Sequence, residues 1–417
     1  MRSSQQQQVD PLLSSITKIQ IRNYRVFRDF EVDLDPGVNI VVGDNDSGKS
    51  TLLEAAGLAL SGKIGRNRLI YELTPHLFNK EAAQEYVAAI NAGEAATPPE
   101  IVIDIHLVET PDTVGFIGAN NLKKEPAPGL SIHVLFDSTF QAEYNAHIAG
   151  KNITMVPAEY YKVESRSFQG DAVTARSVKI ATSTIDATTI RLQSGVDFYL
   201  QKIIQDRLTT NERAELTRAY RSTREEFSDN PSVAEINKKL NEANSSLTKK
   251  ELSLGIDVTQ AAAWERSLTP HLDAIPFHLI GRGDQNAIKI LLALDRERDK
   301  SDVVLVEEPE NHMSPASLTE LLSRITKHSD GKQMLISTHS SYVLNKLGLE
   351  HLLLIHNQVA TRLTELDKST WNFFMKLERA KGFEPSTPTL ARLCSTPELR
   401  PLRRPSAVTG GVVTPYL

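Results

Sequence analysis

One glycine-rich segment constrains the fold of this chain more than any other feature. It reads Gly43-Asp-Asn-Asp-Ser-Gly48-Lys49-Ser50 and is followed by Thr51, which fits the spacing G-x-x-x-x-G-K-[ST]. The run 38–42 before it is short, β-branched and nearly all apolar, as in a strand covered on both faces. The residues after it predict a helix over 49–61 that Gly62 ends. This order predicts an α/β fold in which a mixed sheet is flanked by helices.

The loop has the composition of a phosphate-binding turn. Its glycines let the backbone fold around an anion with N–H groups pointing inward, and the helix start adds the positive end of its dipole. Lys49 places a charge against the β- and γ-phosphates, and the Ser50 hydroxyl is a ligand for Mg²⁺. We therefore predict that ATP is bound by Gly43, Asp44, Asn45, Asp46, Ser47, Gly48, Lys49, Ser50 and Thr51.

Two acidic residues end a second buried strand. The apolar run 303–306 is followed directly by Glu307 and Glu308. We interpret Glu307 as a ligand of Mg²⁺ or of its water, together with Ser50. Glu308 is the candidate general base that orients and deprotonates the water attacking the γ-phosphate.

A histidine follows a further strand. His339 comes just after the run 334–337, one helix and one strand beyond the acidic pair. At this position we expect it to contact the γ-phosphate. The predicted catalytic residues are therefore Glu308, His339 and Lys49.

A second glycine-rich segment precedes a helix predicted over 286–298. It reads Gly281-Arg-Gly283-Asp-Gln285-Asn286, and its glycines and polar side chains at a helix start are typical of an anion site. Taken alone, an ordinary turn explains it equally well. We include Gly281, Gly283 and Gln285 among the candidate nucleotide-binding residues.

Periodicity predicts the other elements of the domain. Strands are expected at 16–22, 30–34, 101–108, 132–136, 334–337 and 352–355, while 110–200 is otherwise weakly patterned. Ser314 caps a helix with Pro315 at its first position. One face of that helix is apolar and consists of Leu318, Leu321, Leu322 and Ile325.

A helical region is predicted over about 198–250. Capping boxes are expected at Thr209 with Glu212 and at Ser232 with Glu235. A narrow apolar stripe follows, made of Val233, Ile236, Leu240, Ala243 and Leu247. Three interpretations stay open: a helical hairpin packed on its own domain, an arm that dimerises, and a basic face that binds DNA.

The order of these motifs resembles the ATPase heads of the ABC superfamily, in the RecF/SMC-like branch. The details are most similar to the OLD (overcoming lysogenisation defect) family of ATP-dependent endonucleases. The similar stretches are 19–27, 43–51, 74–79, 281–286, 307–312 and 337–341. The resemblance covers about 16–377. It implies an ABC-type P-loop head in a homodimer, where Lys49, Ser50 and Thr51 of one chain face the loop 281–286 of the other.

The chain departs from that family pattern in several places. The metal-side acid is Glu307 where most ABC proteins carry Asp, and the 281–286 loop lacks the usual Ser, for which Arg282 or Asp284 is a substitute. The glutamine of the Q-loop is either Gln169 or Gln193.

The C-terminal part departs most. The family continues into a Toprim nuclease domain with an Asp-x-Asp pair, and here that pattern occurs only at Asp33-Leu-Asp35. We expect the nuclease centre to be absent from this chain, either because the gene is truncated or because the ATPase acts with a separate nuclease.

Composition limits the remaining possibilities. The 417 residues contain no apolar run long enough to span a bilayer, one cysteine (Cys394) and a net charge of −5, so we expect a cytoplasmic protein without disulfides. We divide the chain into a disordered lead (1–15), an N-terminal lobe (16–194), a helical insertion (195–255), a C-terminal lobe (256–377) and a disordered or non-native tail (378–417).

These features predict a Mg²⁺-dependent ATPase of the OLD type, acting in DNA processing or phage defence without its own nuclease. Its expected partners are a second copy of the chain, DNA, and a separate nuclease or defence protein. The alternative is a nucleotide-switched module, an SMC/RecF-like clamp that binds DNA or a partner with little turnover. A third possibility is an inert truncated product.

Overall fold

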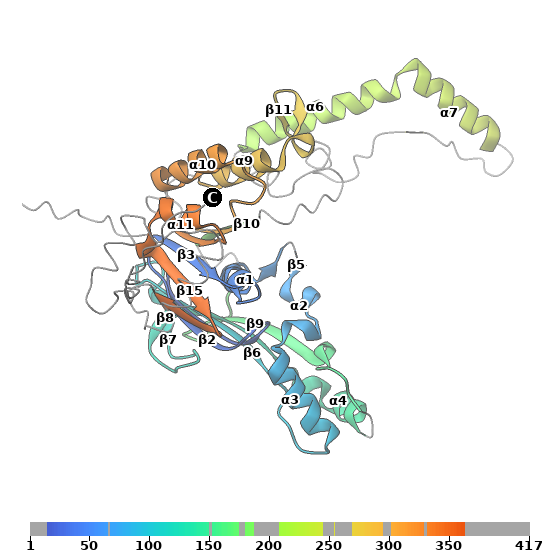
Figure 1. Ribbon diagram of the computed structural model, residues 1–417. Helices are drawn as coiled ribbons and strands as arrows, with labels where there is room; N and C mark the ends of the chain where they lie inside the picture. Colours follow the sequence, from blue (N-terminus) through green and yellow to red (C-terminus); the bar gives the residue numbers. More distant parts are fainter. Residues whose placement is uncertain are drawn as a thin grey trace, which may run out of the picture.

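The computed structural model describes residues 15–65, 67–149, 152–174, 180–186, 208–244, 254, 269–294, 302–328 and 332–362. Two six-stranded sheets lie in separate layers with the helix α1 (Lys49–Ser61) between them (Figure 1). Three further helices cover the other face of the parallel sheet: α9 (Arg282–Leu294), α10 (Pro315–His328) and α11 (Ser341–Leu347).

The parallel sheet contains the strands whose carboxyl ends lie next to the predicted site residues. Its order is β10 (Ala181–Asp186), β13 (Asp302–Glu307), β14 (Gln333–Ser337), β3 (Val38–Gly43), β15 (Leu352–His356) and β16 (Val359–Arg362). The first five strands are parallel and β16 is antiparallel to β15. The carboxyl ends of β3, β13 and β14 therefore meet at one edge, where ligands bind in open α/β sheets.

Strand β13 shows why its sequence is continuously apolar. Val303 and Leu305 pack in the core that contains α1, whereas Val304 and Val306 pack in the core formed with α10. Because side chains alternate between the two faces of a strand, burial of both faces requires an unbroken apolar run. The predicted strands at the start of the chain, at 38–42, 303–306, 334–337 and 352–355, are confirmed.

Two helix ends lie at the predicted capping residues, the end of α1 and the start of α10. Helix α1 ends at Gly62, which has a φ of 68° and donates its N–H to Leu58 O. Helix α10 starts at Pro315, and the Ser314 hydroxyl accepts a hydrogen bond from Ser317 N at 3.1 Å. The predicted apolar face of α10 is buried throughout its four residues, Leu318, Leu321, Leu322 and Ile325.

The antiparallel sheet has the order β2 (Phe27–Asp33), β1 (Ile16–Tyr24), β6 (Ile101–Leu107), β8 (Ala127–Phe136) and β7 (Ile117–Gly118), with β9 (Tyr161–Ser167) also paired to β8. Its inner face packs on α1 through isoleucines of β1 and β6. The smaller elements are β4 (Lys63–Ile64), β5 (Asn67–Arg68), α2 (Leu69–Glu72), α3 (Lys80–Asn91), α4 (Gln141–Ile148), β11 (His271–Leu272) and β12 (Ile275–Pro276), and short 3-10 turns cover 75–77, 114–116, 138–140, 158–160, 277–279 and 349–351.

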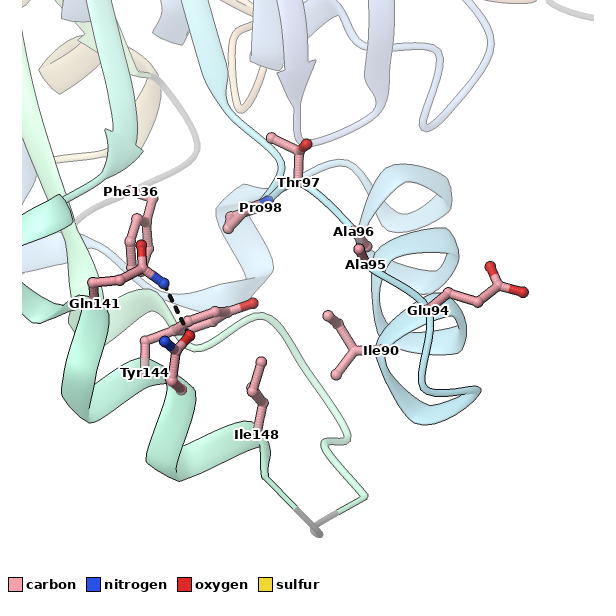
Figure 2. A pocket seen from close by; sticks show the side chains of 11 residues that line it. Ile90, Glu94, Ala95, Ala96, Thr97, Pro98, Phe136, Gln141, Tyr144 and Ile148 are labelled. Atoms are coloured by element: carbon pink, nitrogen blue, oxygen red, sulfur yellow. Dashed lines mark hydrogen bonds between the residues drawn. The ribbon is translucent and has the colours of Figure 1, made fainter.

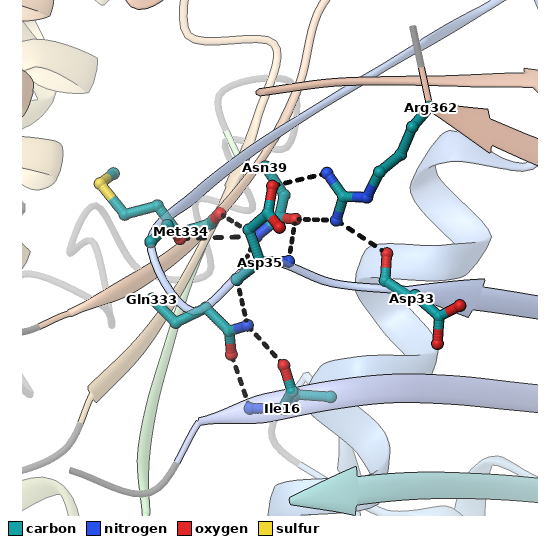
Figure 3. Close-up of polar contacts among 8 residues, drawn as sticks. Ile16, Asp33, Asp35, Asn39, Gln333, Met334 and Arg362 are labelled. Carbon is teal, nitrogen blue, oxygen red and sulfur yellow. Dashed lines mark hydrogen bonds and ion pairs between the residues drawn. The ribbon is translucent and has the colours of Figure 1, made fainter. Parts of the chain in front are cut away.

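A group of polar contacts, here called the clasp, joins the two sheets through Gln333 and Arg362 (Figure 3). Gln333 lies at the start of β14, at the opposite end of this strand from the predicted site residues. Gln333 accepts a hydrogen bond from Ile16 N at 2.8 Å and donates to Ile16 O at 2.6 Å and Asp35 O at 2.8 Å. Arg362 forms an ion pair with Asp35 at 2.6 Å and donates to Asp33 O at 3.0 Å. The Asp33-Leu-Asp35 pattern thus belongs to this clasp.

Two helices, α6 (Thr210–Ser228) and α7 (Pro231–Asn244), extend away from the sheets (Figure 1). The capping box of Thr209 and Glu212 is confirmed. The second predicted box is wrong: α7 begins at Pro231, and the Asn230 side chain accepts a hydrogen bond from Ser232 N at 2.9 Å. Proline already has the φ of a first helical residue, so the helix starts one residue before Ser232.

The apolar stripe of α7 is only partly covered. Val233 is buried, but the Ile236 side chain is 44% exposed. Phe227, near the end of α6, is 40% exposed. No residue of α6 is buried. The stripe residue Leu247 lies outside the described residues. Within the described part of the chain, no helix combines the length and apolarity needed to cross a membrane.

Candidate functional site

The predicted phosphate loop connects the end of β3 to the start of α1, and both of its motif glycines are required by contacts. A Cβ on Gly43 would lie 2.5 Å from Ile355 O. Gly48 has a φ of 106°, and a Cβ there would lie 2.4 Å from the Phe27 ring. Larger residues would therefore displace the neighbouring strands and open the loop.

Lys49 lies inside the loop. It is 6% exposed, and its Nζ donates hydrogen bonds to Gly43 O at 3.2 Å and Asp44 O at 2.7 Å. The ammonium group is thus surrounded by the loop at the position where phosphate oxygens would replace the carbonyls. Among the described residues, no group hydrogen bonds the buried Ser47 hydroxyl, which is a further donor available to an anion in this loop.

The two predicted metal ligands meet across the sheet edge. The Ser50 hydroxyl, at the start of α1, donates a hydrogen bond to the Glu307 carboxylate at the end of β13. An alcohol and a carboxylate from two elements match Mg²⁺, which is bound by few protein oxygens together with water and phosphate. No cluster of three His, Cys, Asp or Glu side chains suited to a metal occurs among the residues that the structure describes.

The predicted base and histidine also lie together. His339 Nε2 is 3.4 Å from Glu308 Oε1, and both side chains are partly exposed (30% and 25%). The Glu308 backbone has a φ of 45°, and its N–H donates to Ser337 O at 2.9 Å. This strained turn aims the carboxylate at the edge where β14 ends.

Two residues of the site were not predicted from the sequence. Asn311 donates from Nδ2 to Glu308 Oε2 at 2.6 Å. Glu310 Oε1 accepts from the Thr338 hydroxyl at 2.7 Å and from His339 N at 2.8 Å. Three acids within four residues at a strand end were a visible signal, but the partners of Glu310 come from the loop that follows another strand, β14.

The loop predicted at 281–286 is instead the first turn of α9, which begins at Arg282 and not at Asn286. A Cβ on Gly283 would lie 2.5 Å from His312 O, and Asn286 Nδ2 donates to Asn311 O at 3.3 Å. Gln285 is buried and donates to Ile280 O at 2.9 Å. This turn therefore packs against the acidic loop of its own chain. The two residues considered as substitutes for the missing Ser, Arg282 and Asp284, are exposed.

The two Q-loop alternatives remain unassigned. Gln169 lies beside β7 in the antiparallel sheet, where a Cβ on Gly118 would come within 2.5 Å of the Gln169 Cα. Gln193 lies outside the described residues.

A cavity of about 360 Å³ lies between α3 and α4 (Figure 2). Ile90, Tyr144 and Ile148 line it together with the polar side chains of Gln141 and Asn145. Figure 1 shows α3 and α4 at the opposite end of the molecule from α9 and α10. The cavity is therefore separate from the phosphate loop and the acidic pair.

Comparison with known proteins identifies relatives of this chain. The family described as "AAA domain" (AAA_23) matches residues 18–335. A DNA double-strand break repair Rad50 ATPase from Halobacterium salinarum is 46% identical over 46 residues, which cover 11% of this chain and 5% of that protein. The chain thus matches only a small part of that relative's length.

Several solved structures are also similar. An SMC head bound to the C-winged helix domain of ScpA is 11% identical with a TM-score of 0.39, over 83% of this chain and 96% of that one. The SMC head domain from Thermotoga maritima is 12% identical with a TM-score of 0.34, over 83% and 97%. A RecF–ATP structure is 12% identical with a TM-score of 0.40, over 84% and 99%.

Proposed function

Because this chain belongs to the AAA domain family and has the α/β fold of an ABC-type ATPase head, we propose that it binds ATP at the loop 43–51 and hydrolyses it with Glu308 and His339. The observation that carries the proposal is the meeting of two residue pairs at one sheet edge. Ser50 contacts Glu307, and Glu308 contacts His339, although these residues come from three separate parts of the chain.

Three side chains of the loop, those of Lys49, Ser47 and Ser50, have proposed roles in binding. Lys49 exchanges its carbonyl partners in the loop for β- and γ-phosphate oxygens, while the backbone N–H groups of the loop and the Ser47 hydroxyl add donors. Ser50 and Glu307 would hold Mg²⁺, which, when bound, neutralises charge on the phosphates.

Glu308 and His339 act on the water and the γ-phosphate. Glu308 accepts the proton of the attacking water, and Asn311 fixes the orientation of its carboxylate by donating to Oε2. His339 lies beside the other carboxylate oxygen, Oε1, and donates a hydrogen bond to the transferring phosphoryl group. Lys49 stabilises the charge that develops on the same group.

The decisive experiment measures release of labelled phosphate from ATP. We expect the purified protein to hydrolyse ATP with Mg²⁺ and the Glu308→Gln variant to keep ATP binding but lose about 100-fold or more in turnover, because an amide cannot accept the proton. Glu109→Gln, an exposed acid after β6, is the matched control and should turn over normally. Normal hydrolysis by Glu308→Gln would refute the assignment.

A second candidate function rests on the arm of α6 and α7. The candidate is a nucleotide-switched module that binds DNA or a partner. Exposed Phe227 and Ile236, on helices that leave the sheets, favour contact with a protein partner. Turnover well below one per minute that DNA does not stimulate favours this function, whereas stimulation by DNA favours an ATPase that drives DNA processing.

The finer role is also a proposal. The Rad50 relative is named for repair of DNA double-strand breaks, and the motif order resembles the OLD family. We propose an OLD-type head that dimerises around ATP and acts on DNA, in processing or phage defence, together with a nuclease on another chain. Copurification of a nuclease subunit with the native protein would support this role. A native complex without a nuclease would contradict it.

A further inference from the structure

Glu310 bridges the two loops that carry Glu308 and His339. Its Oε1 accepts a hydrogen bond from the Thr338 hydroxyl at 2.7 Å and another from the backbone N–H of His339 at 2.8 Å. Glu310 itself follows β13, two residues after Glu308. One carboxylate oxygen therefore links the loop after β13 to the loop after β14, beyond the last paired residues of the two strands.

The loop that Glu310 holds is anchored on its other side. Thr338 is fully buried, and its N–H donates to Val41 O in β3 at 3.1 Å. The Thr338 hydroxyl also accepts from Ser340 N at 2.9 Å. These contacts fix the backbone on both sides of His339. The hydrogen bond from His339 N to Glu310 therefore determines the direction in which the His339 side chain projects from the loop.

The second oxygen of Glu310 indicates that the residue is not there for stability alone. Oε2 is buried and has no hydrogen-bond partner among the described residues. A buried carboxylate that leaves one oxygen without a partner lowers the free energy of unfolding. Such costly groups are typical of sites where geometry matters more than stability.

We propose that Glu310 is a positioning residue for ATP hydrolysis: it holds the His339 backbone so that the imidazole faces Glu308. This role rests on the proposed ATPase function. Glu310 touches neither ATP nor the attacking water and acts through the loop alone.

The first test compares steady-state kinetics of Glu310→Ala, Glu310→Asp and Glu310→Gln. We expect a loss of about 10-fold or more in kcat for Ala and Asp, with KM for ATP within about twofold of the natural protein. Gln should regain most of the turnover because its side-chain oxygen can accept both hydrogen bonds. Thermal unfolding shows which variants are folded, and Asp carries the test if Ala does not fold.

Glu320→Ala, on the exposed surface of α10, is the control and should turn over normally. Unchanged kcat in the Ala and Asp variants overturns the proposal, as does a rise in KM without a fall in kcat. Failure of Gln to restore turnover also overturns it.

A second measurement separates this proposal from the ATPase function. The imidazole ¹⁵N signal of His339, identified by its loss in His339→Gln, reports the surroundings of the ring without ATP. We expect Glu310→Ala and Glu310→Asp to shift this signal and Glu310→Gln and Glu320→Ala to leave it in place. An unshifted signal overturns the positioning role even if the protein hydrolyses ATP, and a shifted signal supports it even if the protein does not.

Discussion

Lys49 is a buried ammonium group whose described hydrogen bonds run to carbonyl oxygens of its own loop. Lys49→Ala should abolish measurable ATP binding, because contacts between a charged donor and phosphate are worth about 1.5–3 kcal/mol each. Isothermal titration with ATP and Mg²⁺ measures the effect. Lys162→Ala, a cation on β9 paired with Glu164, is the control and should bind ATP normally. Equal affinity of the two variants for ATP would contradict a role of Lys49 in binding the nucleotide.

Single residues also mark the limit of prediction from the sequence. The roles of Lys49 and Glu308 follow from residue type and spacing, and these two predictions stay predictions until binding and turnover are measured. Asn311 and Glu310 could not be predicted because their contacts depend on a turn in which Glu308 and His312 have φ of 45° and 63°. Periodicity describes regular elements, and an irregular turn leaves no period in the sequence.

At the scale of elements, the buried strands and the helices with clear caps were predictable. Continuous apolar runs gave β3, β13 and β14, and Gly62 gave the end of α1. Helix α3 and strand β9 were missed because α3 buries only Tyr86 and β9 alternates weakly. The start of α9 was misplaced because Gly283 argues locally for a loop, whereas close packing on His312 O selects glycine inside the helix.

The clasp between the two sheets gives a prediction about stability. Gln333 is 3% exposed and satisfies both the N–H and the C=O of Ile16. Gln333→Ala should lower the free energy of unfolding by about 1–3 kcal/mol, since buried backbone groups lose partners. Urea denaturation measures the change, and Gln141→Ala on α4 should change it by less than about 0.5 kcal/mol. Equal effects of the two substitutions would contradict a structural role for the clasp.

The outer face of the antiparallel sheet gives a prediction about pH. Partial burial raises the pKa of Glu31, but hydrogen bonds from Lys123, Gln20 and Lys18 outweigh it and lower the pKa from 4.5 to about 2. A lowered carboxyl pKa stabilises the fold above pH 4.5, and this stabilisation is lost as the pH falls from 4.5 towards 2.

Glu31→Gln should therefore destabilise the protein near neutral pH by about 0.2–1 kcal/mol, the usual range for partly exposed ion pairs. The difference from the natural protein should shrink as the pH falls through the window given above. Urea unfolding at a series of pH values measures both curves, and the curve of Glu109→Gln should run parallel to that of the natural protein. A constant difference for Glu31→Gln at all pH values would contradict the assignment.

At the scale of the whole molecule, the site lies at one edge of the parallel sheet, and the proposed function includes a second copy of the chain. Glu308→Gln should form a dimer when ATP and Mg²⁺ are added, because bound ATP is not consumed. Light scattering should then report about twice the monomer mass of 46.2 kDa. The double variant Lys49→Ala, Glu308→Gln should stay monomeric. A monomer in both cases would leave the arm of α6 and α7 as the candidate for self-association.

The place of β3 in the parallel sheet has a consequence for synthesis in the cell. Asn39 in β3 contacts Met334 in β14, and 295 residues separate them. At translation rates of about 5–20 residues per second, β3 leaves the ribosome on the order of 15–60 s before its neighbour exists. During that interval both edges of the nascent strand lack their hydrogen-bonding partners and its apolar side chains are exposed, so we expect chaperones to bind it there.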